Sequence, residues 1–162
     1  MKIYGLQWDS VSALPIISGA ITAKYINGGF AQRPVHFGRG IVWIDATGAD
    51  PYDAHWLDIE TGDAKPSDFP AWNHEKHQRI GQFGGFYCNR ATLPAVLDAI
   101  GTAMPADLWL ATLDGTVFPE ETVQLPPNIR LIAVQAFPAA MTGFRSDCSV
   151  IVDQQYWQTR HA

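Results

Sequence analysis

Eight short runs of mainly apolar residues, separated by turns, make up the pattern along the chain. They are residues 3–8, 20–26, 41–44, 55–60, 84–88, 108–113, 129–137 and 149–152. Near-continuous apolarity in runs of this length is typical of strands that are covered on both faces, as in the parallel sheets of α/β proteins. We therefore expect these runs to be the strands of a mainly parallel sheet.

Helix signals are confined to two segments. The first begins after Pro66, with Ser67 as its N-cap and Asp68 in its first turn, and ends at Gly81. The second follows Asn89 or Arg90, has apolar residues at helical spacing, and ends at residue 101. The other connections are too short or too rich in Gly and Pro for helices. A barrel built from this chain would therefore be incomplete, with several helices missing.

Length and composition indicate one globular domain, residues 1–162, in which 47% of the residues are hydrophobic. No apolar run approaches the ~20 residues that a membrane-spanning helix needs, so we expect no membrane insertion. Residues 1–20 carry Lys2 and then Gln7, Asp9 and Ser10 before any long apolar run, and they do not resemble a signal peptide. Cys88 and Cys148 form neither a disulfide framework nor a metal-binding spacing.

The net charge of −5 argues against a nucleic-acid surface, because the eleven Lys and Arg residues form no cluster in the sequence. Aromatic residues are plentiful, with six Trp, five Tyr and eight Phe. Most of them are expected to fill the core. Some could remain free to contact flat apolar faces such as those of sugars.

Four of the apolar runs end in acidic residues, at Asp9, at Asp45, at Asp58 with Glu60, and at Asp114. The carboxyl ends of the strands in a parallel barrel meet at one face, and barrel enzymes carry their active sites there. Asp45 and Asp114 each lie close to a Gly and fit turn residues. Asp9 could be either a turn residue or an active-site residue.

Asp58 and Glu60 form the most informative pair. Alternate residues of a strand point the same way, so both carboxylates share one face while Leu57 and Ile59 share the other. Two like charges held so close shift one another's pKa, which is one way for a protein to keep a general acid protonated. The alternative interpretation is a strand that ends in ordinary solvated acidic residues.

Six short motifs occur in a fixed order along the chain. They are Trp8-Asp9-Ser10, Leu57-Asp58-Ile59-Glu60, Gly85-Phe86-Tyr87, Leu108-Trp109-Leu110-Ala111, Ala133-Val134-Gln135 and Asp147. Their order resembles glycoside hydrolase family 25, and more closely the short glycoside-hydrolase-like proteins of actinobacteria and their phages, from Ile3 to about Trp157. The resemblance implies an α/β fold, an irregular and incomplete (β/α) TIM-like barrel with few helices. It also implies hydrolysis of the β-1,4 link between N-acetylmuramic acid and N-acetylglucosamine in peptidoglycan, without a cofactor.

The resemblance also implies a role for each site residue. Glu60 would be the general acid, and Asp58 would orient the substrate acetamido group or stabilise positive charge at the sugar carbon. Asp9 and Asp147 would tune Glu60 and hold substrate or water. The stereochemical outcome stays open, because a tethered acetamido nucleophile would need no second carboxylate. The mouth of the cleft would be lined by Tyr87, Trp109 and Gln135.

Two structural expectations follow. The four carboxylates Asp9, Asp58, Glu60 and Asp147 should line a single groove at the carboxyl ends of the strands. The pKa of Glu60 should be raised by burial and by its neighbours, whereas Asp58 should remain the more acidic member of the pair. Since no signal peptide is expected, the protein would reach the cell wall through lysis, a holin or a phage particle, or with a signal sequence absent from this chain.

Two rival interpretations were weighed. His74 and His77 with His55 could suggest a metal site, but they lack the HExxH spacing of zinc hydrolases, and a solvated helix face is the simpler interpretation. The second rival is a non-catalytic module that binds the cell wall or forms part of a phage, because a fold does not by itself supply chemistry. The sequence leaves open the exact glycan, the oligomeric state and the redox state of the two cysteines.

Overall fold

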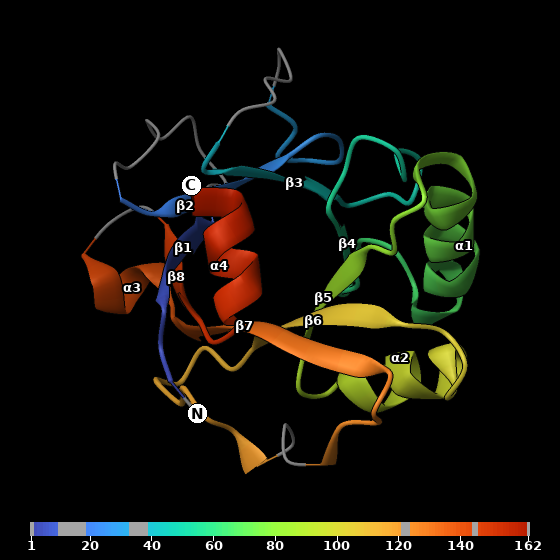
Figure 1. Ribbon diagram of the computed structural model, residues 1–162. Coiled ribbons are helices and arrows are strands. Elements are labelled where there is room, and N and C mark those ends of the chain that lie inside the picture. Colours follow the sequence, from blue (N-terminus) through green and yellow to red (C-terminus); the bar gives the residue numbers. More distant parts are fainter. Residues whose placement is uncertain (1, 10–18, 33–38, 121–123, 144–145, 162) are drawn as a thin grey trace.

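Eight strands close into a barrel in which each strand pairs with its neighbours in sequence order. Figure 1 shows the computed structural model, which describes residues 2–9, 19–32, 39–120, 124–143 and 146–161. All eight predicted strands are present. Their bounds are β1 Gly5–Asp9, β2 Ile21–Tyr25, β3 Ile41–Asp45, β4 Trp56–Asp58, β5 Gly85–Asn89, β6 Ala106–Ala111, β7 Ile129–Phe137 and β8 Asp147–Ile151.

The barrel is mixed rather than fully parallel. Strands β1 to β7 run parallel to one another, but β8 runs antiparallel to both β7 and β1. The expectation of a parallel sheet is therefore wrong for β8. The chain turns back after β7 through the four-residue helix α3 (Ala139–Thr142), and so short a connection allows only an antiparallel return. As a result, Asp147 at the start of β8 pairs with Asp9 at the end of β1.

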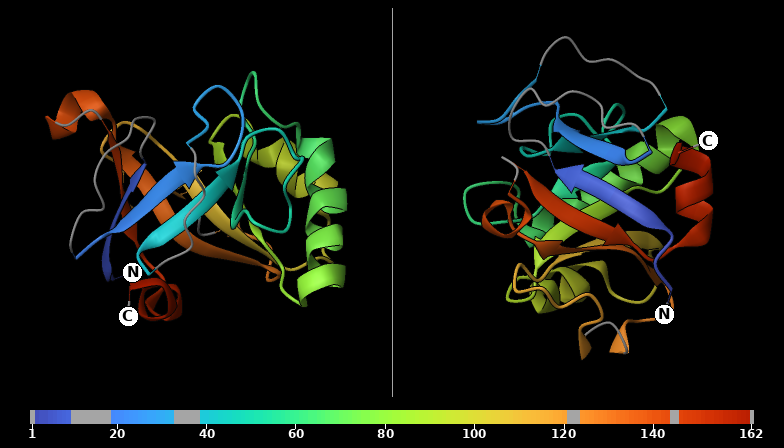
Figure 2. Two further views of the ribbon diagram at one scale, coloured as in Figure 1. Left: turned by 90° about the horizontal axis from the view of Figure 1, so that it is seen from above. Right: turned by 90° about the vertical axis from the view of Figure 1, so that its left-hand side faces the viewer.

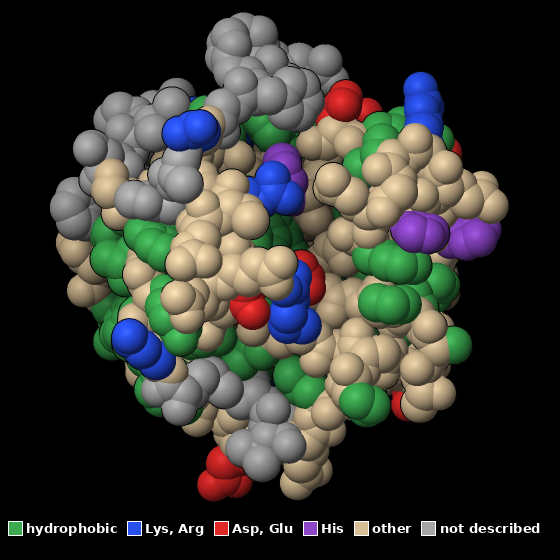
Figure 3. Space-filling model, in the orientation of Figure 1, with side chains coloured by type: hydrophobic (Ala, Val, Ile, Leu, Met, Phe, Trp, Pro, Cys, Tyr) green, Lys and Arg blue, Asp and Glu red, His purple; other side chains and the backbone are tan. Residues whose placement is uncertain are grey.

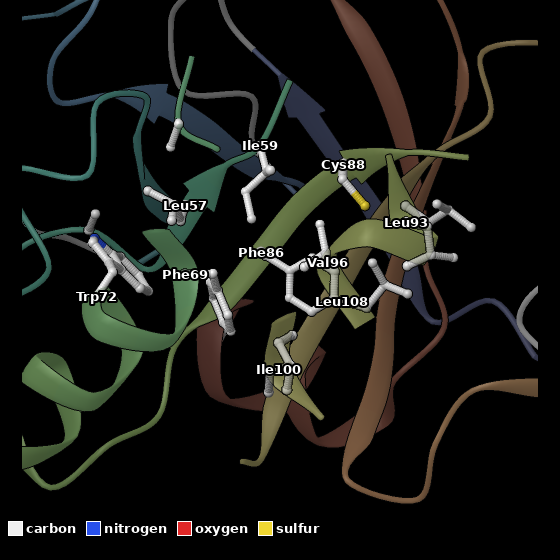
Figure 4. Close-up of a cluster of buried hydrophobic side chains, with 14 of the residues drawn as sticks. Leu57, Ile59, Phe69, Trp72, Phe86, Cys88, Leu93, Val96, Ile100 and Leu108 are labelled. Atoms are coloured by element: carbon white, nitrogen blue, oxygen red, sulfur yellow. The ribbon is translucent and has the colours of Figure 1, made fainter. Parts of the chain in front are cut away.

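Alternate residues of the strands divide the core into two layers. The outer layer packs Leu57 and Ile59 of β4 and Phe86 of β5 against α1 and α2, as Figure 4 shows. The ring of Phe86 meets that of Phe69 on α1 edge to face, with ring centroids 5.1 Å apart. Because residues 57 and 59 point outward, Asp58 between them points into the barrel.

The inner layer is an aromatic plug that fills the amino-terminal end of the barrel, and we call it the barrel floor. It consists of Trp56, Trp109 and Tyr156, with the rings of Trp109 and Tyr156 each 5.8 Å from that of Trp56 in edge-to-face contacts. Tyr156 comes from α4 (Gln154–His161), which crosses that end of the barrel in Figures 1 and 2. The floor gives the barrel a packed interior.

Both predicted helices are present, with one error in a boundary. Helix α1 spans Phe69–Ile80 and ends at Gly81 as predicted, where φ is 70°. Ser67 is not the N-cap, because Pro66–Asp68 forms a 3-10 turn in which the Asp68 carboxylate accepts the backbone N–H of residue 65 at 2.9 Å. Helix α2 spans Leu93–Ile100 and ends before Gly101. Helices α3 and α4 were not predicted.

Two further expectations can be compared with the described part of the chain. No helix in these ranges combines the length and the apolar character that crossing a membrane requires. Cys88 and Cys148 are both buried and neither forms a disulfide.

We predict that Gly85→Ala destabilises the barrel through its floor. A Cβ atom at this position would lie 2.2 Å from Cζ3 of Trp56 and 3.0 Å from the carbonyl oxygen of Asp107, so either the indole or the strand must move. Overpacking of this kind costs about 1–3 kcal/mol. The free energy of unfolding, measured in urea, should fall by this amount.

The matched control is Gly29→Ala, because nothing lies within 4 Å of a Cβ atom built at that position. Its free energy of unfolding should stay within about 0.5 kcal/mol of wild type. Equal stability of the two variants would contradict the packing of Trp56 over Gly85.

Candidate functional site

Four acidic side chains gather at the carboxyl ends of the parallel strands, and we call them the carboxylate cluster. Asp9 ends β1, Asp58 ends β4, Glu60 follows it by two residues, and Asp147 begins β8. The buried side chain of Tyr87 on β5 lies among them. Burial raises the pKa of its hydroxyl, and the charges of all four carboxylates raise it further, which shows that the hydroxyl is close to each of them. The structure therefore brings together the four acids that the sequence analysis selected.

Asp9 and Asp58 are the buried members of the cluster. Their exposed fractions are 5% and 2%, and Oδ1 of each accepts no hydrogen bond from the described residues. Burial and the charge of Asp147 raise the pKa of Asp9 to about 7. Burial and the charge of Glu60 raise the pKa of Asp58 to about 8. Near neutral pH the site therefore holds protons on carboxyl groups that would be ionised in water.

Glu60 is half-buried, and Nδ2 of Asn89 donates a hydrogen bond to its Oε1 at 3.3 Å. Burial raises the pKa of Glu60, and the charges of Asp63 and Asp147 add to this, while the hydrogen bond from Asn89 opposes it. The direction agrees with the expectation for Glu60. The expectation that Asp58 stays the more acidic of the two is wrong, because Asp58 lies deeper in the barrel and loses more solvation.

A chain of hydrogen bonds fixes the cluster. The Tyr87 hydroxyl donates to Oε1 of Gln135, and Nε2 of Gln135 donates to Oδ2 of Asp147 at 3.2 Å. The other oxygen of Asp147 accepts the backbone N–H of Ala139 at 2.6 Å. Gln135 therefore sets the orientation of both a tyrosine hydroxyl and a carboxylate. Its side chain is fully buried, and its predicted contact with substrate stays a prediction.

Trp109 does not lie at the mouth of a cleft, contrary to the expectation. Its side chain is fully buried in the barrel floor, where its Nε1 donates to Oγ of Ser149 at 2.8 Å. Its ring meets that of Tyr87 edge to face with centroids 4.9 Å apart. The alternation of β6 explains this position, since residue 109 points into the barrel below the cluster. Trp109 thus supports Tyr87 from beneath.

Asp45 and Asp114 are turn residues, as their neighbouring glycines predicted. Asp45 points outward and accepts hydrogen bonds from Nε1 of Trp72 at 2.9 Å and Nδ2 of Asn27 at 2.8 Å. Although burial alone would raise its pKa, these and other hydrogen bonds lower it. Asp114 pairs with Arg90 on the surface at 2.8 Å. Neither belongs to the carboxylate cluster.

Two aromatic residues beside the cluster escaped the sequence analysis. The Tyr25 hydroxyl donates to Oδ2 of Asp58 at 3.1 Å, and the ring of Phe30 lies 5.8 Å from that of Tyr25. Phe30 is 54% exposed. Strand alternation after Ile21 and Ala23 places Tyr25 on the inner face, so the sequence carried a signal for it. Phe30 lies in a Gly-rich loop whose path no local pattern predicts.

The three histidines do not converge. His74 contacts Gln78 on the surface, the ring of His77 stacks on that of Phe83, and His55 lies in the amino-terminal half of the barrel. No group of three His, Cys, Asp or Glu side chains within the described ranges is placed to hold a metal ion.

The expected groove at the carboxylate cluster stays a prediction. Cavities lined by described residues lie at the other end of the barrel, near Trp56 and Gly84. Ser10, which belongs to the first motif of the resemblance, lies outside the described residues. Comparisons with family models, with curated proteins and with solved structures found no match to this chain. The resemblance to glycoside hydrolase family 25 therefore rests on its motifs alone.

We predict that Asp58→Asn makes the protein more stable in mildly alkaline solution. The pKa of Asp58 is raised from 3.8 to about 8 on folding, so the folded state binds a proton that the unfolded state has released. The stability that this bound proton gives to the folded state is fully present below pH 3.8 and is lost as the pH rises to about 8. Within that window each such carboxyl lowers the free energy of unfolding by about 1.4 kcal/mol per pH unit.

Urea unfolding at several values between about pH 5 and pH 8 measures this slope. Asp58→Asn should flatten it and should exceed wild type in stability near the upper end. The exposed Asp98→Asn is the matched control and should keep the wild-type slope. Parallel slopes for all three proteins would show that Asp58 titrates normally.

Proposed function

We propose that the protein is a glycoside hydrolase with an irregular TIM-like barrel that cleaves peptidoglycan or a related N-acetylated glycan. The observation that carries this proposal is the carboxylate cluster, which meets around Tyr87 and in which the pKa values of Asp9, Asp58 and Glu60 are raised. Groups held protonated near neutral pH are what general acid catalysis of glycoside cleavage requires.

Glu60 is the proposed general acid. It lies two residues beyond the end of β4 and is half-buried, so it can reach a bound sugar while its pKa stays raised. Asn89 orients its carboxyl group through the bond to Oε1. In this proposal Glu60 protonates the oxygen of the leaving sugar as the glycosidic bond breaks.

Asp58 is the proposed partner of the substrate acetamido group. Its Oδ2 accepts a hydrogen bond from Tyr25, and its buried Oδ1 has no hydrogen-bond partner in the described chain, so the carboxyl group keeps one unused acceptor atom. With a pKa of about 8 it is mainly protonated at neutral pH. In its ionised form the carboxylate accepts the N–H of the acetamido group and stabilises the positive charge that develops as the acetamido oxygen attacks the sugar carbon. Such a role suits a substrate-assisted mechanism, in which no second carboxylate attacks the sugar.

Asp9 and Asp147 are proposed to tune this pair. Asp147 raises the pKa of both Asp9 and Glu60, and Gln135 fixes its position. The exposed ring of Phe30, beside Tyr25, offers an apolar face on which a sugar can stack. The site of action in this proposal is the cell wall.

The test is Glu60→Gln, which keeps the size and hydrogen bonding of the side chain and removes its transferable proton. We expect the rate of release of reducing ends from purified peptidoglycan to fall by a factor on the order of 10²–10⁴. Sedimentation with peptidoglycan should be retained, because the rest of the site is intact. Asp58→Asn should also lose activity, but less completely.

The matched control is Glu75→Gln on the exposed face of α1, which should keep wild-type activity. The proposed hydrolase activity would be contradicted if wild-type protein sedimented with peptidoglycan but released no reducing ends at any pH or with any wall type. That result would instead support a non-catalytic module that binds the cell wall or forms part of a phage.

A further inference from the structure

A cavity of about 680 Å³ opens at the amino-terminal end of the barrel, away from the carboxylate cluster. It lies between α1, α4 and the first residues of β4 and β5, and its lining includes His55, Lys76 and Arg160. Figure 3 shows a hollow on this face with basic, acidic and histidine side chains around it. We call it the floor cavity, because Trp56 and Tyr156 of the barrel floor also line it.

Arg160 on α4 is the first unsatisfied donor of the floor cavity. Within the described residues its guanidinium has no ion pair or hydrogen bond, whereas its backbone oxygen accepts the N–H of Gly40 at 2.8 Å. Its charge lowers the pKa of His55 and of Lys76, which places the guanidinium near both. Burial raises the pKa of Asp107 and the charge of Arg160 opposes this, but the two side chains form no ion pair. A guanidinium close to two other donors, with no hydrogen bond of its own, is available to an anion.

His55 adds a second donor. Its Nδ1 accepts the backbone N–H of Trp43 at 3.0 Å, so in the neutral ring the hydrogen must be on Nε2. The ring is neutral because burial, followed by the charges of Arg160 and Lys76, lowers its pKa to about 3. The Nε2–H group finds no acceptor in the described chain. Trp56 also lines the cavity, where its indole interacts with the hydroxyl of Tyr156.

Lys76 is the second cation. Its Nζ donates to the carbonyl oxygens of Pro51 at 2.9 Å and of Ala54 at 2.6 Å, which uses two of its three N–H groups. Burial and the charge of Arg160 lower its pKa to about 8. The ammonium group therefore remains mainly charged at neutral pH, held rigidly with one donor to spare.

The acidic side chains of the floor cavity do not neutralise these donors. Asp107 is occupied by Arg130, whose Nε and Nη2 contact its two oxygens at 2.9 and 3.0 Å. Asp53 is exposed, and its charge acts on Lys76 only as the last of the three influences on that pKa. The cavity thus contains more hydrogen-bond donors and positive charge than its own acceptors can match.

We propose that the floor cavity binds a small organic molecule through an oxyanion group, a phosphate or a carboxylate, held by Arg160, Lys76 and His55. Arg160 supplies a planar pair of donors, and Lys76 and His55 supply single donors, a set that matches the acceptors of such a group. The volume is within the range of roughly 300–1,000 Å³ found for small-molecule sites. The inference does not depend on the proposed hydrolase activity, because none of these residues belongs to the carboxylate cluster.

Binding can be tested on the wild-type protein with glycerol 3-phosphate, glycerate and glycerol, which offer a phosphate, a carboxylate and neither group. We expect one of the two anions to give saturable changes in ¹H–¹⁵N spectra, including the indole signal of Trp56, which Trp56→Phe identifies. The same anion should raise the melting temperature in proportion to occupancy. Glycerol, and sodium chloride at equal ionic strength, should do neither.

Arg160→Gln removes the unpaired cation at a partly exposed position, and we expect it to weaken binding of that anion at least tenfold. The control is Arg90→Gln, at the other end of the barrel, which should bind as wild type does. Binding that survives Arg160→Gln unchanged would overturn the proposal, as would wild-type spectra that respond to neither anion. If Arg160→Gln fails to fold, the wild-type spectra test the proposal alone. The indole signal of Trp56 must then shift when the anion binds, and an unchanged signal would overturn the proposal.

Discussion

The hydrogen-bonded pairing of β8 with β1 closes the barrel, and the arrangement of acidic residues depends on it. Because β8 enters from the carboxyl ends of the other strands, its first residue, Asp147, lies opposite Asp9. A parallel last strand would have carried Asp147 to the other end of the barrel. The antiparallel return of β8 therefore brings acidic residues from both ends of the sequence into one cluster. The negative charges of these carboxylates repel one another. Burial of Asp9 and Asp58 in that field opposes ionisation, and it costs stability that the two core layers must offset.

Patterns of apolar residues predicted the elements, and strand alternation predicted much of the site. The eight strands followed from near-continuous apolar runs, helix α1 from its start and stop signals, and helix α2 from the helical spacing of its apolar residues. The inward direction of Asp58 followed from Leu57 and Ile59. The antiparallel direction of β8 could not be predicted in this way, because a run of apolar residues looks the same for a parallel and for an antiparallel strand. Helix α4 was missed because it is polar, and among its residues 154–160 only Tyr156 is buried.

Depth within the barrel was the quantity that local patterns could not supply. The sequence placed Asp58 and Glu60 on one face but could not tell which lies deeper, and this decides which pKa rises more. Trp109 shows the same limit, because alternation gives its inward direction while only the packed barrel places it in the floor beneath Tyr87. The floor cavity had no sequence signature, since His55, Lys76 and Arg160 come from segments far apart in the chain.

Because β8 closes the barrel, the barrel can form only late in synthesis, after β8 has been made. The register from Gly5 opposite Ile151 to Asp9 opposite Asp147 joins segments separated by nearly the entire chain. Until β8 has been made, β1 and β7 are both open edges, with backbone groups available for pairing with other chains. Contacts of such large sequence separation form late and slowly. A nascent chain therefore carries the open edge of β1 through most of its translation, and that of β7 only in the interval before β8 is made. Such edges make the unfinished barrel a client for chaperones that shield exposed strands.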